Sequence, residues 1–265
     1  MQQLPKKQEE VTSSPNLSGK RILVTDDNEM NRLVAITILK NYGVIPEEAH
    51  NGKEAVEKLK TGHFDIVLMD VQMPEMDGIE ATRVIRSEIS KTLPIIALTA
   101  LALKGDESRF LQAGMSDYVS KPFEEAQFIN IISRWLGLEK PVLVKEVVNT
   151  EKMDTLYDLS KLQEIAKGNQ EFINRMIQMF IDQGPSSVKE ITEAFKAKDF
   201  SKVNKVAHRF KTSVNNMGIS ALKTDITEIE LLAESDPSSE KLGGLIAKLE
   251  TVIGQVITQL KASAA

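Results

Sequence analysis

The sequence of 265 residues contains no cysteine, which excludes disulfide bonds and thiolate chemistry. It also lacks an apolar run long enough to cross a bilayer, and its first residues, MQQLPKKQEE, lack the apolar core of a signal peptide. The formal net charge of -5 is mild and gives no reason to expect nucleic acid or an anionic membrane as a partner. Hydrophobic residues make up 42% of the chain and charged residues 27%, which is typical of a soluble globular protein, here with about two domains.

The hydrophobic pattern divides the first half of the chain into two parts. Residues 1–18 are polar and predict a flexible leader. Residues 19–138 alternate short Val- and Ile-rich runs with helical patterns, and the runs lie at 21–27, 43–49, 64–70, 93–100 and 117–123. Five strand–helix units of this kind predict an α/β domain with a doubly wound, parallel sheet of five strands.

The second half of the chain has no comparable alternation. Residues 139–155 have no clear period and are interpreted as a linker, with a short strand at VLVKEVV as the alternative. Residues 156–265 are helical segments with apolar stripes and short connections, which predicts an all-α helical bundle. The segments are LSKLQEIAKG, NQEFINRMIQMFIDQG, PSSVKEITEAFKAK, FSKVNKVAHRFKTSVNNMG, SALKTDITEIELLAES and SSEKLGGLIAKLETVIGQVITQLKA.

Charged and polar residues stand at the ends of the predicted strands. They are Asp26 and Asp27 after the first strand, Asp70 at the third, Thr99 at the fourth and Lys121 at the fifth. Because the carboxyl ends of parallel strands share one edge of a sheet, these side chains are expected to converge in space. The alternative, that such acids are helix N-caps, is preferred for Asp77 ahead of GIEATRV, but it does not account for the whole set.

This set of residue types has a chemical meaning. Three carboxylates at one site raise one another's pKa, and a divalent cation would compensate for their repulsion. Hard oxygen ligands select Mg²⁺ or Mn²⁺. Together with the cation, the Lys121 ammonium and the Thr99 hydroxyl can stabilise a phosphoryl group, and an aspartate can be the nucleophile that forms an acyl phosphate. The residues therefore predict phosphoryl transfer.

The segments LVTDDNEMNR, IVLMDVQMPEMDG, ALTA and DYVSKPF resemble the response-regulator receiver domain, which has a flavodoxin-like fold. The resemblance covers all five predicted strands. It implies that Asp70 is the phosphoacceptor, that Asp27 binds the metal directly and that Asp26 acts through water. It further implies a metal ligand in the backbone carbonyl of Gln72, phosphoryl contacts from Thr99 and Lys121, a switch role for Tyr118 and a cis Lys121–Pro122 bond.

The helical half contains His208, one of three histidines in the chain. On a helix, His208 lies opposite the apolar stripe and is expected to face solvent together with Lys205, Lys211 and Thr212. An isolated surface histidine usually has no function. In a chain with an aspartyl-phosphate site, however, a neutral imidazole can act as a nucleophile near pH 7. The stripe consists of Val203, Val206, Phe210, Val214 and Met217.

The segment AHRFKTS resembles the motif of the histidine-phosphotransfer (Hpt) domain, a four-helix bundle with an exposed phosphorylated histidine. The resemblance implies that His208 is the phosphorylated residue, and it matches Lys211 and Ser213 to the lysine and the small residue of the motif. The family usually has glycine four residues after the histidine, where this chain has Thr212. A threonine adds bulk on the expected exposed face, which calls close docking of a receiver into question.

The order of the two domains resembles the C-terminal part of a hybrid sensor histidine kinase. It implies that Asp70 accepts a phosphoryl group from a histidine kinase, which can be the same polypeptide, and that His208 donates it to a downstream response-regulator receiver. A stand-alone intermediate and a non-titrating scaffold are the alternatives. The chain has no G-x-x-x-x-G-K-[ST] loop, so phosphotransfer without ATP binding is expected. We expect no nucleic acid, no direct membrane contact and a cytoplasmic location, including the cytoplasmic side of a membrane-bound sensor.

Overall fold

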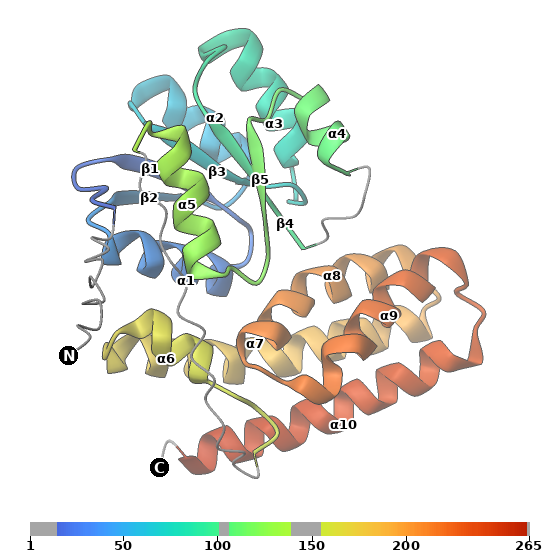
Figure 1. Ribbon diagram of the computed structural model, residues 1–265. Helices are drawn as coiled ribbons and strands as arrows, with labels where there is room; N and C mark the ends of the chain where they lie inside the picture. The colour runs from blue at the N-terminus through green and yellow to red at the C-terminus, as the bar shows by residue number, and fades with distance from the viewer. Residues whose placement is uncertain (1–14, 101–105, 139–154, 264–265) are drawn as a thin grey trace, which may run out of the picture.

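The computed structural model describes residues 15–100, 106–138 and 155–263, which form a sheet domain at the top of Figure 1 and a helical domain beneath it. Residues 1–14 of the predicted leader lie outside the described residues, as do residues 139–154 with the alternative strand at VLVKEVV. Within the described part of the chain, no helix is long and apolar enough to span a bilayer.

The sheet has five parallel strands in the order β2-β1-β3-β4-β5, which confirms the predicted α/β fold. Every residue of β3 and β4 is buried, as expected of apolar strands covered on both faces. The strand order reverses between β1 and β3, so the switch point of the sheet lies at their carboxyl ends. The strands are β1 (Arg21–Thr25), β2 (Ile45–Ala49), β3 (Ile66–Asp70), β4 (Ile95–Thr99) and β5 (Asp117–Ser120).

Helices cover both faces of this sheet and enclose two apolar cores. One face carries α1 (Glu29–Asn41) and α5 (Glu125–Trp135), and the other carries α2 (Gly52–Thr61), α3 (Gly78–Val84) and α4 (Asp106–Gln112). A π-helical turn, Ile85–Ile89, follows α3, and the apolar period of the sequence did not indicate it.

The packed part of the sheet domain begins earlier than the sequence predicts. Pro15 and Leu17 are buried, and the backbone N–H of Leu17 donates to the carbonyl oxygen of Tyr42 at 3.1 Å. The prediction of a flexible leader up to residue 18 is therefore wrong for residues 15–18. The physical reason is that Leu17 fills the apolar core at the end of α1, although its neighbours in sequence are polar.

The helical domain contains a four-helix bundle, as predicted. α8 packs between α7 and α9, and α10 packs on both α7 and α9. A shorter helix, α6, lies between α7 and α1 of the sheet domain. The helices are α6 (Ser160–Ala166), α7 (Gln170–Lys196), α8 (Phe200–Asn216), α9 (Lys223–Ser235), preceded by a 3-10 turn at Ser220–Leu222, and α10 (Glu240–Ser263).

One boundary inside this domain differs from the prediction. The sequence suggested separate helical segments on either side of Pro185, whereas α7 runs through it without a break. A proline inside a helix removes one backbone hydrogen bond. Packing offsets this cost, because Gly184 lies against Ile253 and Ile257 of α10 in the core of the bundle.

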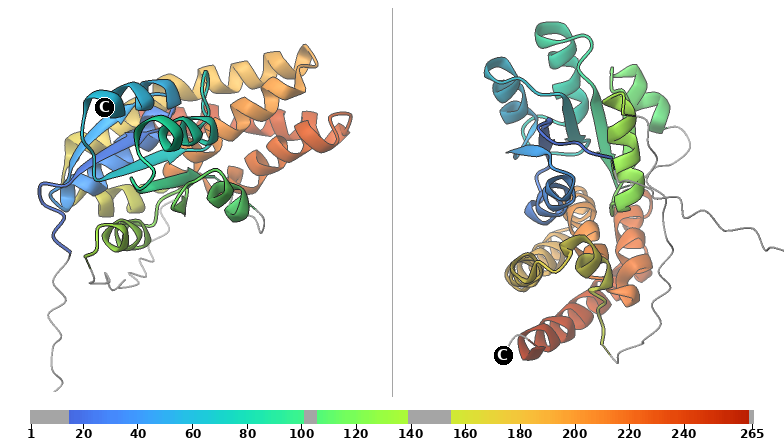
Figure 2. Two further views of the ribbon diagram at one scale, coloured as in Figure 1. Left: turned by 90° about the horizontal axis from the view of Figure 1, so that it is seen from above. Right: turned by 60° about the vertical axis from the view of Figure 1, so that its left-hand side comes forward.

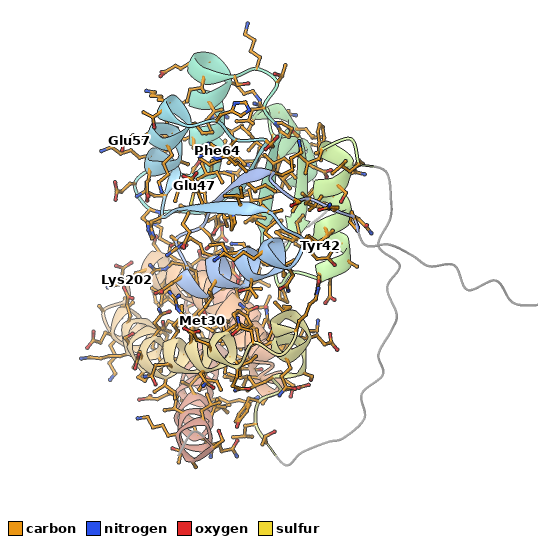
Figure 3. The ribbon with its side chains drawn as sticks, turned by 90° about the vertical axis from the view of Figure 1, so that its left-hand side faces the viewer. Met30, Tyr42, Glu47, Glu57, Phe64 and Lys202 are labelled. Atoms are coloured by element: carbon orange, nitrogen blue, oxygen red, sulfur yellow. The ribbon has the colours of Figure 1, made fainter. Side chains whose placement is uncertain are left out.

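The two domains contact each other along α1. Figure 3 shows Met30 on α1 at the junction with the helical domain, and both views of Figure 2 place α1 and α6 side by side. Buried apolar side chains continue from the α1 face of the sheet into the bundle as one cluster. The asparagine Asn41 near the end of α1 donates from Nδ2 to the backbone oxygen of Ile165 at 2.8 Å.

Candidate functional site

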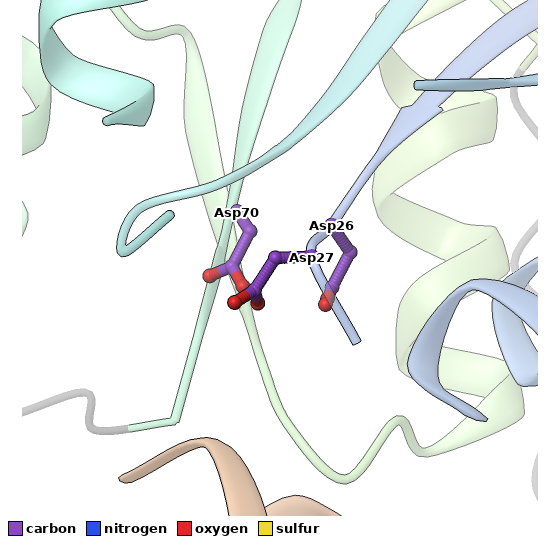
Figure 4. A group of neighbouring side chains, drawn as sticks. All are labelled: Asp26, Asp27 and Asp70. Atoms are coloured by element: carbon purple, nitrogen blue, oxygen red, sulfur yellow. The ribbon is translucent and has the colours of Figure 1, made fainter. Parts of the chain in front are cut away.

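Three carboxylates meet at the switch point of the sheet. Asp26 and Asp27 follow β1 and Asp70 ends β3, and one carboxylate oxygen from each lies within 4.8 Å of the others (Figure 4). Lys121, which follows β5, places Nζ 2.7 Å from Oδ2 of Asp26 and 2.7 Å from Oδ2 of Asp70. The structure thus brings together the acids and the lysine that the sequence predicted to converge.

The loop after β1 shows why these acids are available for chemistry. Asn28, and not an aspartate, is the N-cap of α1: its Oδ1 accepts from the backbone N–H of Met30 at 2.9 Å. The capping alternative is therefore wrong for Asp26 and Asp27. Asp26 is held instead by Asn31, whose Nδ2 donates to its carboxylate at 3.2 and 3.3 Å. Sequence reasoning missed Asn31, because an asparagine inside a helical run carries no distinctive signal.

The loop after β3 depends on a glycine. A Cβ at Gly78 would lie 2.0 Å from the backbone oxygen of Asp70, so no larger residue fits without moving that backbone. Asp77 caps α3 by accepting from the backbone N–H of Glu80 at 2.7 Å, which confirms its predicted structural role. The sequence signal for Gly78 is its place in MPEMDG, between a buried strand and the helix GIEATRV.

The remaining predicted residues lie around the same edge. Thr99 is the buried last residue of β4, and its carbonyl oxygen accepts from the backbone N–H of Lys121 at 2.7 Å. The backbone nitrogen of Gln72 lies 3.4 Å from Oδ1 of Asp70, so the Gln72 peptide is beside the carboxylate. Tyr118 on β5 is half-buried, with its ring centroid 6.4 Å from that of Phe110. The predicted cis Lys121–Pro122 bond is confirmed.

The carboxylates outnumber the cations that face them. Burial raises the pKa of the Asp70 carboxyl; Lys121 opposes this and Asp26 adds to it, and the net pKa lies above the ordinary value. Burial and then Asp26 raise the pKa of Asp27 against the opposing effects of Lys121 and Arg209. Burial alone would lower the pKa of Lys121, but the two carboxylates on it raise it. A set of oxygen ligands with unbalanced negative charge fits a hard divalent cation such as Mg²⁺.

A second cluster of titratable groups surrounds His208 on α8. Its Nδ1 lies 2.5 Å from Oε1 of Glu230 on α9, and Nζ of Lys211 lies 2.5 Å from the other oxygen, Oε2. The Glu230 side chain is 7% exposed and that of Lys211 is 4% exposed. Sequence reasoning missed Glu230. The available signal was its position four residues after Ile226, on the buried side of α9.

Two expectations about the face around His208 are wrong. Lys211 and Thr212 are buried, not exposed beside the histidine, and the His208 side chain itself is 14% exposed. For Lys211 the reason is that α9 packs on this side of α8 and presents Glu230 to the ammonium. Lys205 remains exposed, as predicted.

The arrangement around His208 suits a nucleophile. Burial would raise the pKa of Glu230, but hydrogen bonds from His208 and Lys211 outweigh it and lower the pKa. An ionised carboxylate accepts the Nδ1–H of a neutral imidazole, and this fixes the tautomer whose lone pair is on Nε2. The same carboxylate balances the buried charge of Lys211. His208 therefore has one ring nitrogen held and the other left for reaction.

Comparisons with known proteins agree with the two-domain organisation. Residues 22–133 match the family model of the response regulator receiver domain, and residues 175–262 match that of the Hpt domain. The sensor histidine kinase GacS of Pseudomonas protegens is 29% identical over 92% of this chain and 27% of its own length. BarA, a signal transduction histidine-protein kinase of Escherichia coli, is 30% identical over 83% of this chain and 25% of its own length. The chain thus spans about a quarter of these relatives.

Among solved structures, the receiver domain of the sensor histidine kinase PA1611 from Pseudomonas aeruginosa is 42% identical. The match covers 45% of this chain and 99% of that one, with a TM-score of 0.43. That structure holds a magnesium ion coordinated in its active-site cleft.

Proposed function

Residues 22–133 are a response regulator receiver domain and residues 175–262 are an Hpt domain, and we propose that the chain carries a phosphoryl group in two steps, first on Asp70 and then on His208. The observation that carries the proposal is the position of Lys121, whose ammonium lies 2.7 Å from both Asp26 and Asp70 at the switch point of the sheet. A fixed cation beside a carboxylate nucleophile is the arrangement that phosphoryl transfer needs.

In the first step, a carboxylate oxygen of Asp70 attacks the phosphorus of a phosphohistidine on a histidine kinase. The P–N bond breaks, the kinase imidazole leaves, and Asp70 becomes an acyl phosphate. Lys121 and the hydroxyl of Thr99 would contact the phosphoryl oxygens. A Mg²⁺ ion, or Mn²⁺ in its place, would be held by Asp26, Asp27, Asp70 and the Gln72 carbonyl and would neutralise phosphoryl charge.

In the second step, Nε2 of His208 attacks the phosphorus of the acyl phosphate. The P–O bond to Asp70 breaks and the carboxylate leaves, while Nδ1 keeps its proton against Glu230. The ring of the resulting phosphohistidine is cationic, and the ionised Glu230 stabilises it. An aspartate of a downstream receiver would then accept the group from His208 by the reverse chemistry.

We assign the histidine kinase that phosphorylates Asp70 to the same polypeptide as this chain. The reason is that GacS and BarA are both named as histidine kinases and match this chain over only about a quarter of their own length. A cytoplasmic location, where ATP-dependent kinases act, follows from this assignment. Tyr118, beside β4, is assigned as the residue whose position reports the state of Asp70. A stand-alone intermediate remains the second candidate.

The order of the two steps can be tested with a histidine kinase and labelled ATP. The unaltered chain should take up label in a base-labile form on Asp70 and an acid-labile form on His208. Asp70→Asn should abolish both, and His208→Gln should retain the label on Asp70. Strong labelling of His208 in the Asp70→Asn chain by the same kinase would refute the proposed order.

A further inference from the structure

The receiver loop that carries the carboxylates touches the helix that carries His208. Asn28, the residue after Asp27, donates from Nδ2 to the backbone oxygen of Arg209 at 3.2 Å and to Oγ of Ser213 at 3.1 Å. Arg209 directly follows His208 on α8. The catalytic edge of the receiver domain therefore lies on α8 beside the histidine in this single chain.

The polar residues of α8 on this side are buried. Thr212, Ser213 and Asn216 have exposed fractions of 4%, 4% and 9%. At about 100° per residue, all three lie within roughly 140° of His208, on the side of Arg209 and away from the face that α9 covers. Asn28 bonds Ser213 in this sector, so the receiver domain contributes to the burial of Ser213 and lies beside the part of α8 that follows His208.

Charges across the junction have one polarity. Among the described residues, three ion pairs join the receiver domain to α6 and α7, and in each the acid belongs to the receiver and the base to the helical domain. They are Glu29–Arg175 at 3.0 Å, Glu124–Lys161 at 2.5 Å and Glu125–Lys167 at 2.9 Å. Lys167 also lies over the ring of Tyr42 at 4.8 Å. Pairs as exposed as these contribute little affinity, but uniform polarity selects one partner and one orientation.

We propose that the receiver domain docks on the helical domain of its own molecule in an orientation set by these three acid-to-base pairs, so that transfer from Asp70 to His208 is intramolecular. The transfer part of the proposal depends on the proposed function, whereas the docking part does not. Covalent connection makes weak docking sufficient, because a tethered partner has an effective concentration on the order of millimolar.

Docking can be measured without any phosphoryl group. The chain has no native cysteine, so Lys53→Cys on α2 and Glu250→Cys on α10 place two spin labels at defined, exposed sites, one in each domain. This doubly labelled chain without further changes, the parent, should show one narrow distribution of distances between the two labels. Changing Glu29, Glu124 and Glu125 to Lys should broaden it, and adding Lys161→Glu, Lys167→Glu and Arg175→Glu should narrow it again.

A matched control carries the same change of charge elsewhere. Glu57, Glu80 and Glu88 are exposed on the α2 and α3 side of the sheet, and Figure 3 shows Glu57 far from the helical domain. Changing these three to Lys should leave the narrow distribution intact. The docking would be overturned if the parent and the chain with reversed junction acids gave distance distributions of equal breadth. It would also be overturned if the chain with all six junction charges exchanged were folded but kept the broad distribution.

Transfer kinetics test the intramolecular step. In the intact chain, transfer from phosphorylated Asp70 to His208 should be independent of protein concentration. In a mixture of His208→Gln donor and Asp70→Asn acceptor chains at about 10 μM each, transfer should be roughly a hundredfold slower, the ratio of a millimolar effective concentration to 10 μM. Equal rates in the mixture and the intact chain would overturn intramolecular transfer.

Discussion

Glu230 has two partners, and their roles can be separated by mutation. Glu230→Ala removes the carboxylate that Lys211 contacts at 2.5 Å and leaves that ammonium in a site where its side chain is 4% exposed. Breaking a buried ion pair by deleting one partner costs about 3–5 kcal/mol. For a domain of this size, that corresponds to a fall in Tm of more than about 10 °C, measurable by circular dichroism.

Replacing both partners with apolar residues of similar size should have a different result. Buried ion pairs exchanged for apolar side chains are often neutral or stabilising. The double variant Lys211→Met with Glu230→Leu should therefore recover most of the lost stability. It still leaves Nδ1 of His208 without its acceptor, and a hydrogen bond to a charged group contributes about 1.5–3 kcal/mol. Transfer to His208 should accordingly slow by about ten- to a hundredfold in single-turnover assays.

The pH dependence follows from the same carboxylate. The pKa of Glu230 in the folded protein lies below its ordinary value of 4.5. Its contribution to the free energy of unfolding is therefore fully present above pH 4.5 and is lost as the pH falls through the folded pKa. The double variant should lose less stability in this acid window than the parent. A folded double variant with the parent's transfer rate, or a Glu230→Ala chain with the parent's Tm, would refute the two roles assigned to Glu230.

Three further predictions concern the metal, the glycine loop and Thr212. Asp27→Ala should weaken Mg²⁺ binding more than Asp26→Ala in calorimetry, and a concentration of 100 times Kd should stabilise the unaltered chain by about 2.7 kcal/mol; equal affinities in the Asp27→Ala and unaltered chains would contradict the assignment. Gly78→Ala should destabilise the receiver domain by about 1–3 kcal/mol, because its Cβ would lie 2.0 Å from the Asp70 backbone oxygen. The control Gly254→Ala places its Cβ in open space on α10 and should stabilise the bundle by about 0.5–1 kcal/mol, because alanine is a better helix former than glycine. Thr212→Gly should lower the free energy of unfolding by at least about 0.5–1 kcal/mol, because glycine is a poor helix former and the threonine is buried; unchanged thermal unfolding would show that this burial contributes nothing.

The receiver site was predictable because its signals are local and its geometry is topological. Four of the five strands, all except β2, end in a functional residue or directly precede one, and a parallel sheet brings such ends to one edge, as Asp26, Asp70 and Lys121 show. The environment of His208 was less predictable, because the period of one helix shows which face is apolar but not which polar residues a neighbour covers. Glu230 and the burial of Lys211 depend on how α9 packs against α8.

The continuity of α7 through Pro185 was also unpredictable because it depends on packing between helices. A Gly-Pro pair normally indicates a break, but α7 is buried on both sides of the pair, at Phe180 and Val188, and Gly184 itself packs against α10, so the helix continues. The buried end of the leader is a further case. Leu17 is one apolar residue among polar ones, and its burial is set by the end of α1, to which it becomes adjacent only after folding.

If His208 carries the phosphoryl group as proposed, the shared carboxylate of Glu230 would also affect how long the helical domain stores it. In the proposed transfer, the phosphorylated ring that keeps its Nδ1 proton is a cation, and a carboxylate 2.5 Å away would stabilise that loaded state. Lys211 contacts the same carboxylate, and its positive charge weakens this stabilisation of the loaded state. In this scheme, the balance between the two contacts would set how much phosphoryl group is on the histidine relative to the aspartate. A residue on α9 would then make the bundle a reservoir whose retention time could be tuned without altering either proposed phosphoacceptor.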